Sequence, residues 1–154
     1  MLRTVQITQE KVIHFNGMPL MLLCDEATGS AIPVFIGTTE ANAIVGELRD
    51  VNSPRPMTHD LFKEVLLGLG AMVTGLVVTK LDDEGIYHGL LAVERDGQEL
   101  KFDCRPSDGI ALALKFGSPV QVDEQVFIDS LSNPQTEQLM DLVDAAIQSI
   151  NDQQ

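Results

Sequence analysis

The N-terminal third of the chain alternates apolar and polar positions, which is typical of half-buried strands. Segments 12–15 and 19–24 flank Asn16-Gly17, a dipeptide that favours a tight hairpin turn. Segment 31–36 has the composition of a further strand. Pro33 within it favours an edge position, because proline cannot donate a hydrogen bond to the ladder. The pattern therefore predicts a small antiparallel unit at the start of the chain.

Three later segments carry apolar residues at helical spacing: 38–48, 58–69 and 106–116. Thr58 is the predicted N-cap of the second. Pro106 opens the third, where its missing N–H would have had no partner in the helix. The third segment is almost wholly apolar, so we expect a buried helix there. The second has an apolar face that we expect to pack on the rest of the domain.

Between the second and third helices, the pattern predicts three strands at 72–81, 86–94 and 98–103. Asp96-Gly97 is a strong signal for a hairpin between the last two. After the third helix, 119–122 resembles a short edge strand. The hairpins imply antiparallel pairing, and strands do not alternate strictly with helices. We therefore expect an α+β fold with a curved, mixed and largely antiparallel sheet.

The last part of the chain predicts a turn at 123–127 and then an amphipathic helix that opens at 132–134. Its apolar positions lie on one side: Leu139, Leu142, Val143, Ala146, Ile147 and Ile150. That side covers the domain or pairs with a second copy of the chain, and the sequence leaves both open. We divide the chain into a domain at 1–129 and a C-terminal helix at 130–154.

Composition and charge restrict the partners. The chain has 154 residues, 44% of them hydrophobic, and a formal net charge of -13. No Lys or Arg occurs from Phe116 to the end, so nucleic acid would have to bind through a local site. No apolar run approaches a membrane span and residues 1–6 do not resemble a signal peptide, so we expect a cytoplasmic protein without membrane contact. Cys24 and Cys104 lack metal-ligand spacing and are predicted to be buried thiols.

Two arginines mark the first candidate site. Arg55 and Arg105 each precede a proline and a helix, so both should be held in an extended conformation. Guanidinium groups bind phosphate in a bidentate manner, and we assign both arginines to catalysis and substrate binding. The alternative, that each arginine pairs with an aspartate to fix a corner of the fold, carries equal weight.

Three carboxylates accompany the arginines. Asp60, Asp103 and Asp108 would converge on Mg²⁺ or Mn²⁺ if the two helix starts meet, and Asp103 would also act in catalysis. The alternative for Asp60 and Asp108 is capping of a helix N-terminus, worth about 0.3–1 kcal/mol each. Asp103 ends a strand and caps nothing obvious.

The remaining candidates are polar residues at the two helix starts. His59 is the predicted general base or a metal ligand, and its alternative is a hydrogen bond to a neighbouring loop. Thr58 and Ser107 are predicted to contact substrate. Glu40 lies at the start of the first helix, where we expect it to cap. Phosphate-binding glycine loops, nucleophile elbows and zinc pairs are missing from the sequence.

These residues, in this order, give the chain a resemblance to the bifunctional nuclease domain family. The match runs from about Thr4 to Phe127 and is densest at four segments: 33–37, 40–41, 55–61 and 103–108. Departures are Gly109 where alanine is expected and Lys115 where arginine is expected, and no helical hairpin module follows Asp129. The resemblance implies a cytoplasmic α+β domain that forms a homodimer or higher oligomer, with relatives that cleave DNA and RNA. It implies no catalytic mechanism.

Two functions follow as hypotheses. The first is metal-assisted phosphodiester hydrolysis of DNA or RNA at the two proline-opened helices. The second is a non-catalytic oligomeric module for binding or regulation, in which the arginine–aspartate corners are structural. A weaker third is a scaffold assembled through the C-terminal helix.

Overall fold

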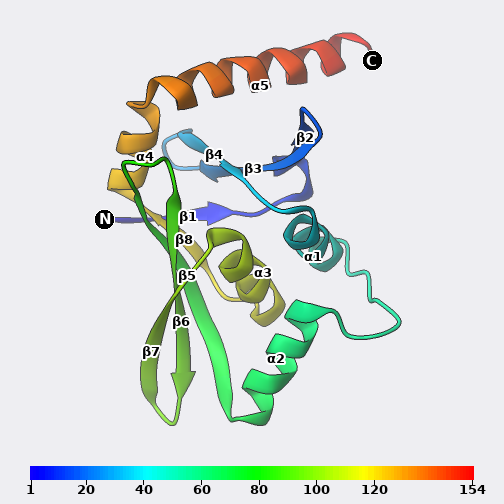
Figure 1. The fold of residues 1–154 in the computed structure, drawn as a ribbon, viewed down its shortest axis with the longest axis vertical. Helices are drawn as coiled ribbons and strands as arrows, with labels where there is room; N and C mark the ends of the chain where they lie inside the picture. Colours follow the sequence, from blue (N-terminus) through cyan, green and yellow to red (C-terminus); the bar gives the residue numbers. More distant parts are fainter.

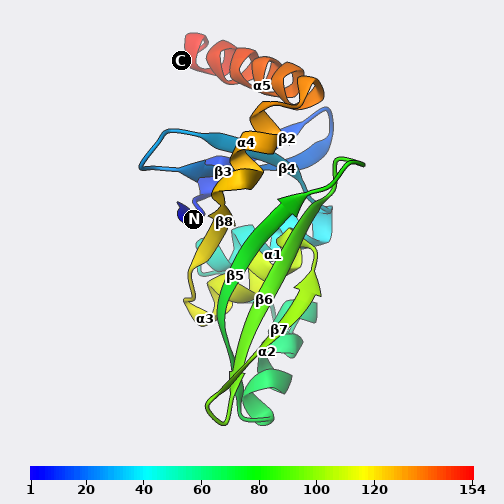
Figure 2. The ribbon, with the colours of Figure 1, turned by 90° about the vertical axis from the view of Figure 1, so that its left-hand side faces the viewer.

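A computed structural model describes residues 1–154 and contains one eight-stranded sheet. The strand order is β2-β3-β1-β8-β5-β6-β7, and β4 pairs with the other edge of β3. Only β5 and β8 pair in parallel, so the expected mixed, largely antiparallel sheet is confirmed. Figure 2 shows β2–β4 running across the direction of β5–β7, which gives the sheet its curvature. The strands are β1 Leu2–Gln6, β2 Val12–Phe15, β3 Met18–Asp25, β4 Ala31–Phe35, β5 Ala71–Leu81, β6 Tyr87–Arg95, β7 Gln98–Cys104 and β8 Val120–Asp123.

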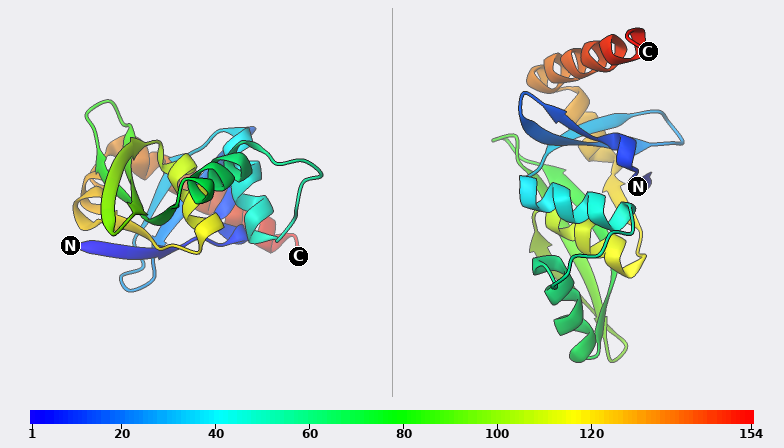
Figure 3. Two further views of the ribbon diagram at one scale, coloured as in Figure 1. Left: turned by 90° about the horizontal axis from the view of Figure 1, so that it is seen from below. Right: turned by 90° about the vertical axis from the view of Figure 1, so that its right-hand side faces the viewer.

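Five α-helices and one 3-10 turn surround the sheet. In Figure 1, α5 lies along β2–β4 at one end of the molecule, while α2 lies at the other end. Helices α1, α2 and α3 all lie on one side of β5–β7, and α3 contacts α1, α2 and β5 (Figure 3). The bounds are η1 Gln9–Lys11, α1 Thr38–Leu48, α2 Thr58–Gly68, α3 Pro106–Phe116, α4 Glu124–Leu131 and α5 Pro134–Asp152.

The predicted hairpins form as expected. Asn16 and Gly17 have φ values of 51° and 79°, and Asp96 and Gly97 have 51° and 76°. Two consecutive residues with positive φ match the twist of the flanking strands, so each dipeptide closes a two-residue hairpin. Pro33 lies on β4, which pairs only with β3, and the predicted edge position is confirmed.

Two predictions near the C-terminus were wrong. Segment 119–122 is not an edge strand, because β8 pairs with β1 on one side and with β5 on the other. Only Pro119 itself lies outside the strand, so its missing N–H costs the ladder nothing. Residues 123–127 are not a turn but the cap and first turns of α4. The Asp123 side chain accepts from the backbone N–H of Gln125 at 2.9 Å and so caps that helix.

The main core lies between the sheet and α3, whose residues Ile110, Ala111 and Ala113 are fully buried. A second, small core joins Val143 of α5 to Leu20 and Leu22 of β3. Helix α5 thus packs on its own domain mainly through Val143, its one buried residue. The apolar residues Leu142, Ile147 and Ile150 remain exposed. No helix in the chain is both long and apolar enough to cross a membrane.

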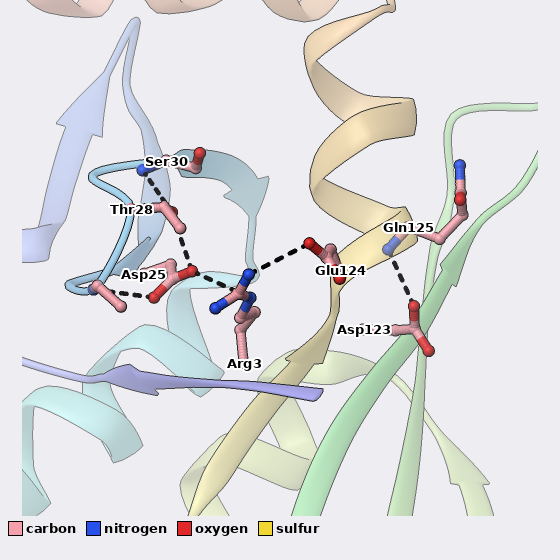
Figure 4. A network of polar contacts seen from close by, with 8 residues as sticks. Arg3, Asp25, Thr28, Ser30, Asp123, Glu124 and Gln125 are labelled. Atoms are coloured by element: carbon pink, nitrogen blue, oxygen red, sulfur yellow. Dashed lines mark hydrogen bonds and ion pairs between the residues drawn. The ribbon is translucent and has the colours of Figure 1, made fainter. Parts of the chain in front are cut away.

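A network of polar contacts around the buried carboxylate of Asp25 connects β1 with β3 and α4 (Figure 4). Asp25 is 3% exposed and accepts from Thr28 Oγ1 at 2.9 Å and from the Ala27 N–H at 3.0 Å. Arg3 lies 3.6 Å from Asp25 Oδ2 and donates to Glu124 at 3.2 Å. This network fastens β1 to the start of α4, where β8 also lies against β1.

Candidate functional site

The starts of α1, α2 and α3 meet the end of β7 around one cleft of about 710 Å³. One end of the cleft is polar, and the other is apolar and runs between α2 and the strands β6 and β7. Its lining residues are Thr39, Glu40, Thr58, His59, Phe62, Leu66, Leu91, Val93, Phe102, Asp103, Cys104, Arg105, Asp108, Gly109 and Leu112. Most of the residues predicted from the sequence therefore share one cavity.

A chain of four charged or polar side chains crosses the polar end. His59 Nε2 lies 3.0 Å from Asp108 Oδ1. Arg105 Nε donates to Asp108 Oδ2 at 2.8 Å, and its Nη2 donates to Glu40 Oε1 at 2.7 Å. The His59 side chain is 9% exposed while that of Arg105 is 65% exposed. These four residues, called the relay below, therefore extend from a buried histidine to the solvent.

Local sequence explains why these residues meet. Arg105 precedes Pro106 and is extended, with φ -67° and ψ 140°, so it is the N-cap residue of α3 and not part of the helix. Asp108 lies one helical turn later, where it faces the arginine. Hydrogen bonds to Glu40 and then to Asp108 raise the pKa of Arg105, so the guanidinium stays charged.

Asp60 belongs to a separate cluster around Lys115. Lys115 Nζ donates to Asp60 Oδ1 at 2.6 Å and to Glu47 Oε2 at 3.1 Å, and its side chain is only 9% exposed. The hydrogen bond from Lys115 lowers the pKa of Asp60, and the Met57 N–H adds to this effect. Burial alone would lower the pKa of Lys115, but its bonds to Asp60 and Glu47 outweigh that and raise it. This cluster joins α1, α2 and α3.

The three predicted metal ligands do not form one group. No three His, Cys, Asp or Glu side chains lie close enough together to hold a metal ion. Asp60 is bonded to Lys115, and Asp108 to His59 and Arg105. Asp103 lines the cleft but follows Phe102 on β7, and successive side chains of a strand alternate, so its carboxylate projects to the opposite face. A sequence has no means of showing this divergence.

Three further candidates take places of their own. Arg55 is exposed, forms no ion pair and lines neither this cleft nor the Lys115 cluster's pocket. Thr58 lines the cleft but is not the N-cap, because Met57 occupies that position and Asp60 accepts from the Met57 N–H at 2.9 Å. Met57 is therefore the N-cap, and the Asp60 side chain, three positions after it, reaches back to its backbone N–H. Ser107 lines a different cavity.

Sequence reasoning missed the partners of Glu40 and Lys115. For Glu40, capping of α1 was favoured over an approach to the site, yet its carboxylate binds Arg105 across 65 residues of chain. Its side chain folds over Gly37, where a Cβ would collide with it, so glycine at 37 is the one local signal. Lys115 lies at the far end of an apolar helix, where a cation complements the dipole, and nothing in the sequence indicates its partners.

Cys104 is not a nucleophile candidate. Both cysteines are free and half-buried rather than fully buried as expected. Burial, followed by the charges of Asp108 and Asp103, raises the pKa of Cys104 to about 11. A thiol with such a pKa is protonated near neutral pH and reacts slowly.

Comparison with known proteins identifies the family of the chain. The model of the bifunctional nuclease domain matches residues 21–135. The chain belongs to the bifunctional nuclease domain family. The match extends from within β3 to the first turn of α5 and so includes every residue that lines the cleft.

Curated relatives of this family member fall into two groups. An uncharacterized protein of Mycobacterium tuberculosis is 34% identical over 122 residues, which cover 79% of the chain and 72% of that protein. Bifunctional nuclease 1 of Arabidopsis thaliana is 26% identical over 107 residues, or 68% of the chain, and that of Oryza sativa subsp. japonica is 23% identical over 109 residues, or 70%. The chain spans about a third of the length of these plant proteins, 33% in both cases.

Proposed function

We propose that this member of the bifunctional nuclease domain family is a phosphodiesterase that cleaves nucleic acid in the cleft between α2, α3 and β7. The observation that carries the proposal is the His59–Asp108–Arg105–Glu40 chain of contacts at the mouth of an open cavity. A histidine oriented by a carboxylate, next to a guanidinium, is the arrangement expected of a general base beside a phosphate contact.

Each residue of the relay receives a role. Asp108 holds the His59 ring through Nε2, which leaves Nδ1 to take a proton from the attacking water or hydroxyl. Arg105 is two-thirds exposed and directs its remaining N–H groups toward phosphate oxygens. Glu40 positions Arg105 and does not touch the substrate. Thr58 contributes a hydroxyl on the wall of the cleft.

The apolar end of the cleft favours unpaired bases. Phe62 of α2 and Phe102 of β7 both line the cleft and are 47% and 51% exposed. Aromatic faces stack on bases of any sequence, with about 1–3 kcal/mol per base. A double helix hides those base faces, so we propose single-stranded RNA or DNA as the substrate. The net charge of -13 gives no long-range attraction for nucleic acid, so we expect binding to depend on this local site and to weaken as the salt concentration rises.

We propose a divalent ion only as one that the protein and the substrate hold together. Because no three acidic or histidine side chains form a ligand group, the protein would supply one carboxylate, that of Asp108, with waters and substrate phosphate oxygens as the other ligands. Bound there, Mg²⁺ or Mn²⁺ would supply charge stabilisation to the phosphodiester. Arg55 lies outside the cleft, so it would contact phosphate only on a substrate long enough to reach its loop.

The test is cleavage of 5′-labelled single-stranded RNA and DNA with Mg²⁺, with Mn²⁺ and with chelator. His59→Ala should lower kcat/KM by about 10²–10⁴-fold, the usual contribution of a general base. His14→Ala is the matched control, since His14 is exposed on β2 outside the cleft. Asp108→Asn tests the orientation of His59, and Asp103→Asn tests whether a carboxylate on the other face of β7 contributes to cleavage. Cleavage that continues at the same rate in the His59 and Asp108 variants would assign the activity to a contaminant or to another site.

A second function is favoured by a different observation. The outer surface of α2 exposes Leu61, Val65 and Leu69 by 58%, 51% and 58%. Such a surface suits an oligomeric module, in which the ion pairs of the cleft are structural. Sedimentation of the wild type and Leu61→Ser would decide: a homodimer that the substitution dissociates, together with absence of cleavage, supports this alternative.

A further inference from the structure

A second cavity, of about 590 Å³, lies on the other side of Arg105. Its walls come from β4, the turn between β5 and β6, and the first turns of α3 and α5. Figure 1 shows the β5–β6 turn and the start of α5 near one another beside α4. The volume is within the range of small-molecule sites, roughly 300–1,000 Å³.

No acidic side chain lines this cavity, although the chain has 23 acidic residues and 10 basic ones. Arg105, whose guanidinium is bonded to Glu40 and Asp108, is its one charged lining residue. The cleft, by contrast, is lined by Glu40, Asp103 and Asp108. An anion therefore meets less repulsion in this cavity than in the cleft.

Ser107 lies at the wall of the cavity and is 5% exposed as a residue. Its hydroxyl forms no hydrogen bond to another group of the protein and is not among the fully enclosed polar atoms, so it is accessible from the cavity. A nearly buried side chain with an accessible, unpartnered hydroxyl is free to bind a ligand there. It occupies the first turn of α3, where Pro106 has no N–H and the first helical bond is from Gly109 to Arg105.

The same turn supplies further donors. Since the helical ladder begins at Gly109, the N–H groups of Ser107 and Asp108 have no helical partner. The first turn of α5 approaches from the opposite wall with Gln135 and Thr136. The Gln135 N–H already donates to the capping Asn133 Oδ1 at 2.9 Å, so the free N–H groups come from α3. Those N–H groups, the Ser107 hydroxyl and the Arg105 guanidinium share one cavity and favour a phosphate group.

The rest of the cavity is apolar. Phe35 and Ile86 line it and are 47% and 52% exposed, and Leu139 of α5 adds to the wall. Exposed side chains of this size facing a cavity suit a flat organic group. The phosphate end and the apolar wall lie within one volume.

We propose that this cavity binds a small phosphate monoester with a flat organic body, of the class of a nucleoside monophosphate. The phosphate accepts from Ser107, from the first turn of α3 and from Arg105, and the flat body lies against Phe35 and Ile86. The inference does not depend on cleavage in the cleft, because binding alone is required.

Calorimetry with adenosine 5′-monophosphate tests it, with inorganic phosphate, adenosine and ribose 5-phosphate as separate arms. The monophosphate should bind more tightly than each fragment, and Ser107→Ala should weaken it several-fold. Gln135→Glu places a carboxylate on the wall of the cavity and should raise the dissociation constant about tenfold. Gln138→Glu is the matched control, an equally exposed glutamine of α5 that does not line the cavity.

The proposal is supported if Gln135→Glu weakens binding, Gln138→Glu does not, and the amides of Ser107 and Thr136 shift in ¹H–¹⁵N spectra. It is overturned if the wild type does not bind the monophosphate at millimolar concentration, if the two glutamine variants behave alike, or if the shifts occur around Phe62 in the cleft. A chain that cleaves no RNA can still pass this test, and a chain that cleaves RNA can still fail it.

Discussion

Helices α2 and α3 begin with similar sequences and end in different environments. Each begins within three residues of the arginine of an Arg-Pro dipeptide, both have 11 residues, and both are rich in apolar side chains. Seven residues of α3 are buried, whereas His59 is the one buried residue of α2. The expected packing of the α2 apolar face is only partial: Leu66 packs against the main core, and α2 contacts β5 and α3. The other side of α2 stays exposed, because α3 already occupies most of the space next to β5 and β6.

Because α3 is buried and α2 is mostly exposed, the two helices contribute differently to the site and to stability. Helix α3 forms the core and carries Arg105, Asp108 and Lys115 in fixed positions at its two ends. Helix α2 contributes His59 to this frame and leaves its outer surface free. Substitutions should therefore cost stability in α3 and leave it nearly unchanged on the outer side of α2.

The largest effect is expected in the middle of α3. Ile110 is fully buried, so Ile110→Ala removes buried methyl groups and leaves a cavity, at a cost of about 2–5 kcal/mol. Ile150→Ala on α5, where the side chain is 59% exposed, is the control and should change the free energy of unfolding by less than about 0.5 kcal/mol. Urea unfolding measures both. Similar losses in the two variants would contradict the burial of α3.

Asp60→Asn tests the link between the helices. It removes a charged hydrogen bond to a nearly buried lysine, so unfolding at pH 7 should become easier by about 1.5–3 kcal/mol. The pKa of Asp60 is lowered in the folded state, so its contribution is present above the ordinary value of 3.8 and is lost as pH falls through the folded value. The difference between wild type and variant should shrink below pH 4. Asp83→Asn, in an exposed turn, should show neither effect.

Gly109→Ala tests how closely α3 approaches the sheet. A Cβ at this position would collide with the Leu76 side chain, which is 1% exposed and has little room to move. Overpacking of about 1–3 kcal/mol should outweigh the gain in helix propensity of roughly 1 kcal/mol. Thermal unfolding at matched concentration measures the result. A stabilised variant would show that Leu76 repacks, and alanine, expected at this position from the family resemblance, would then fit.

The smallest effect is expected on α2. Val65 is 51% exposed, so Val65→Ser should change the free energy of unfolding by about 0.5 kcal/mol or less. A loss well above 1 kcal/mol that depends on protein concentration would show that a second copy covers α2 in solution.

The sequence by itself determined most elements and several of their ends. Asn-Gly and Asp-Gly predicted both hairpins, because few other dipeptides adopt consecutive positive φ angles at low cost. The proline at 106 located the start of α3, and the apolar run predicted its burial. The sequence spacing also places Arg105 and Asp108 in one helical turn. These features depend on backbone preferences and on spacing over a few residues, which a sequence contains directly.

Only the tertiary structure decided how the elements share space. The same apolar content placed α3 inside and α2 outside, and β8 became a central strand because β1 pairs with its other side. The distant partners of Arg105, His59 and Lys115, namely Glu40, Asp108 and Glu47, lie 49 to 68 residues away in the chain. The divergence of Asp60, Asp103 and Asp108 likewise depends on which face of β7 meets α3. Such contacts are fixed by packing between distant segments, and local patterns do not encode which surfaces will meet.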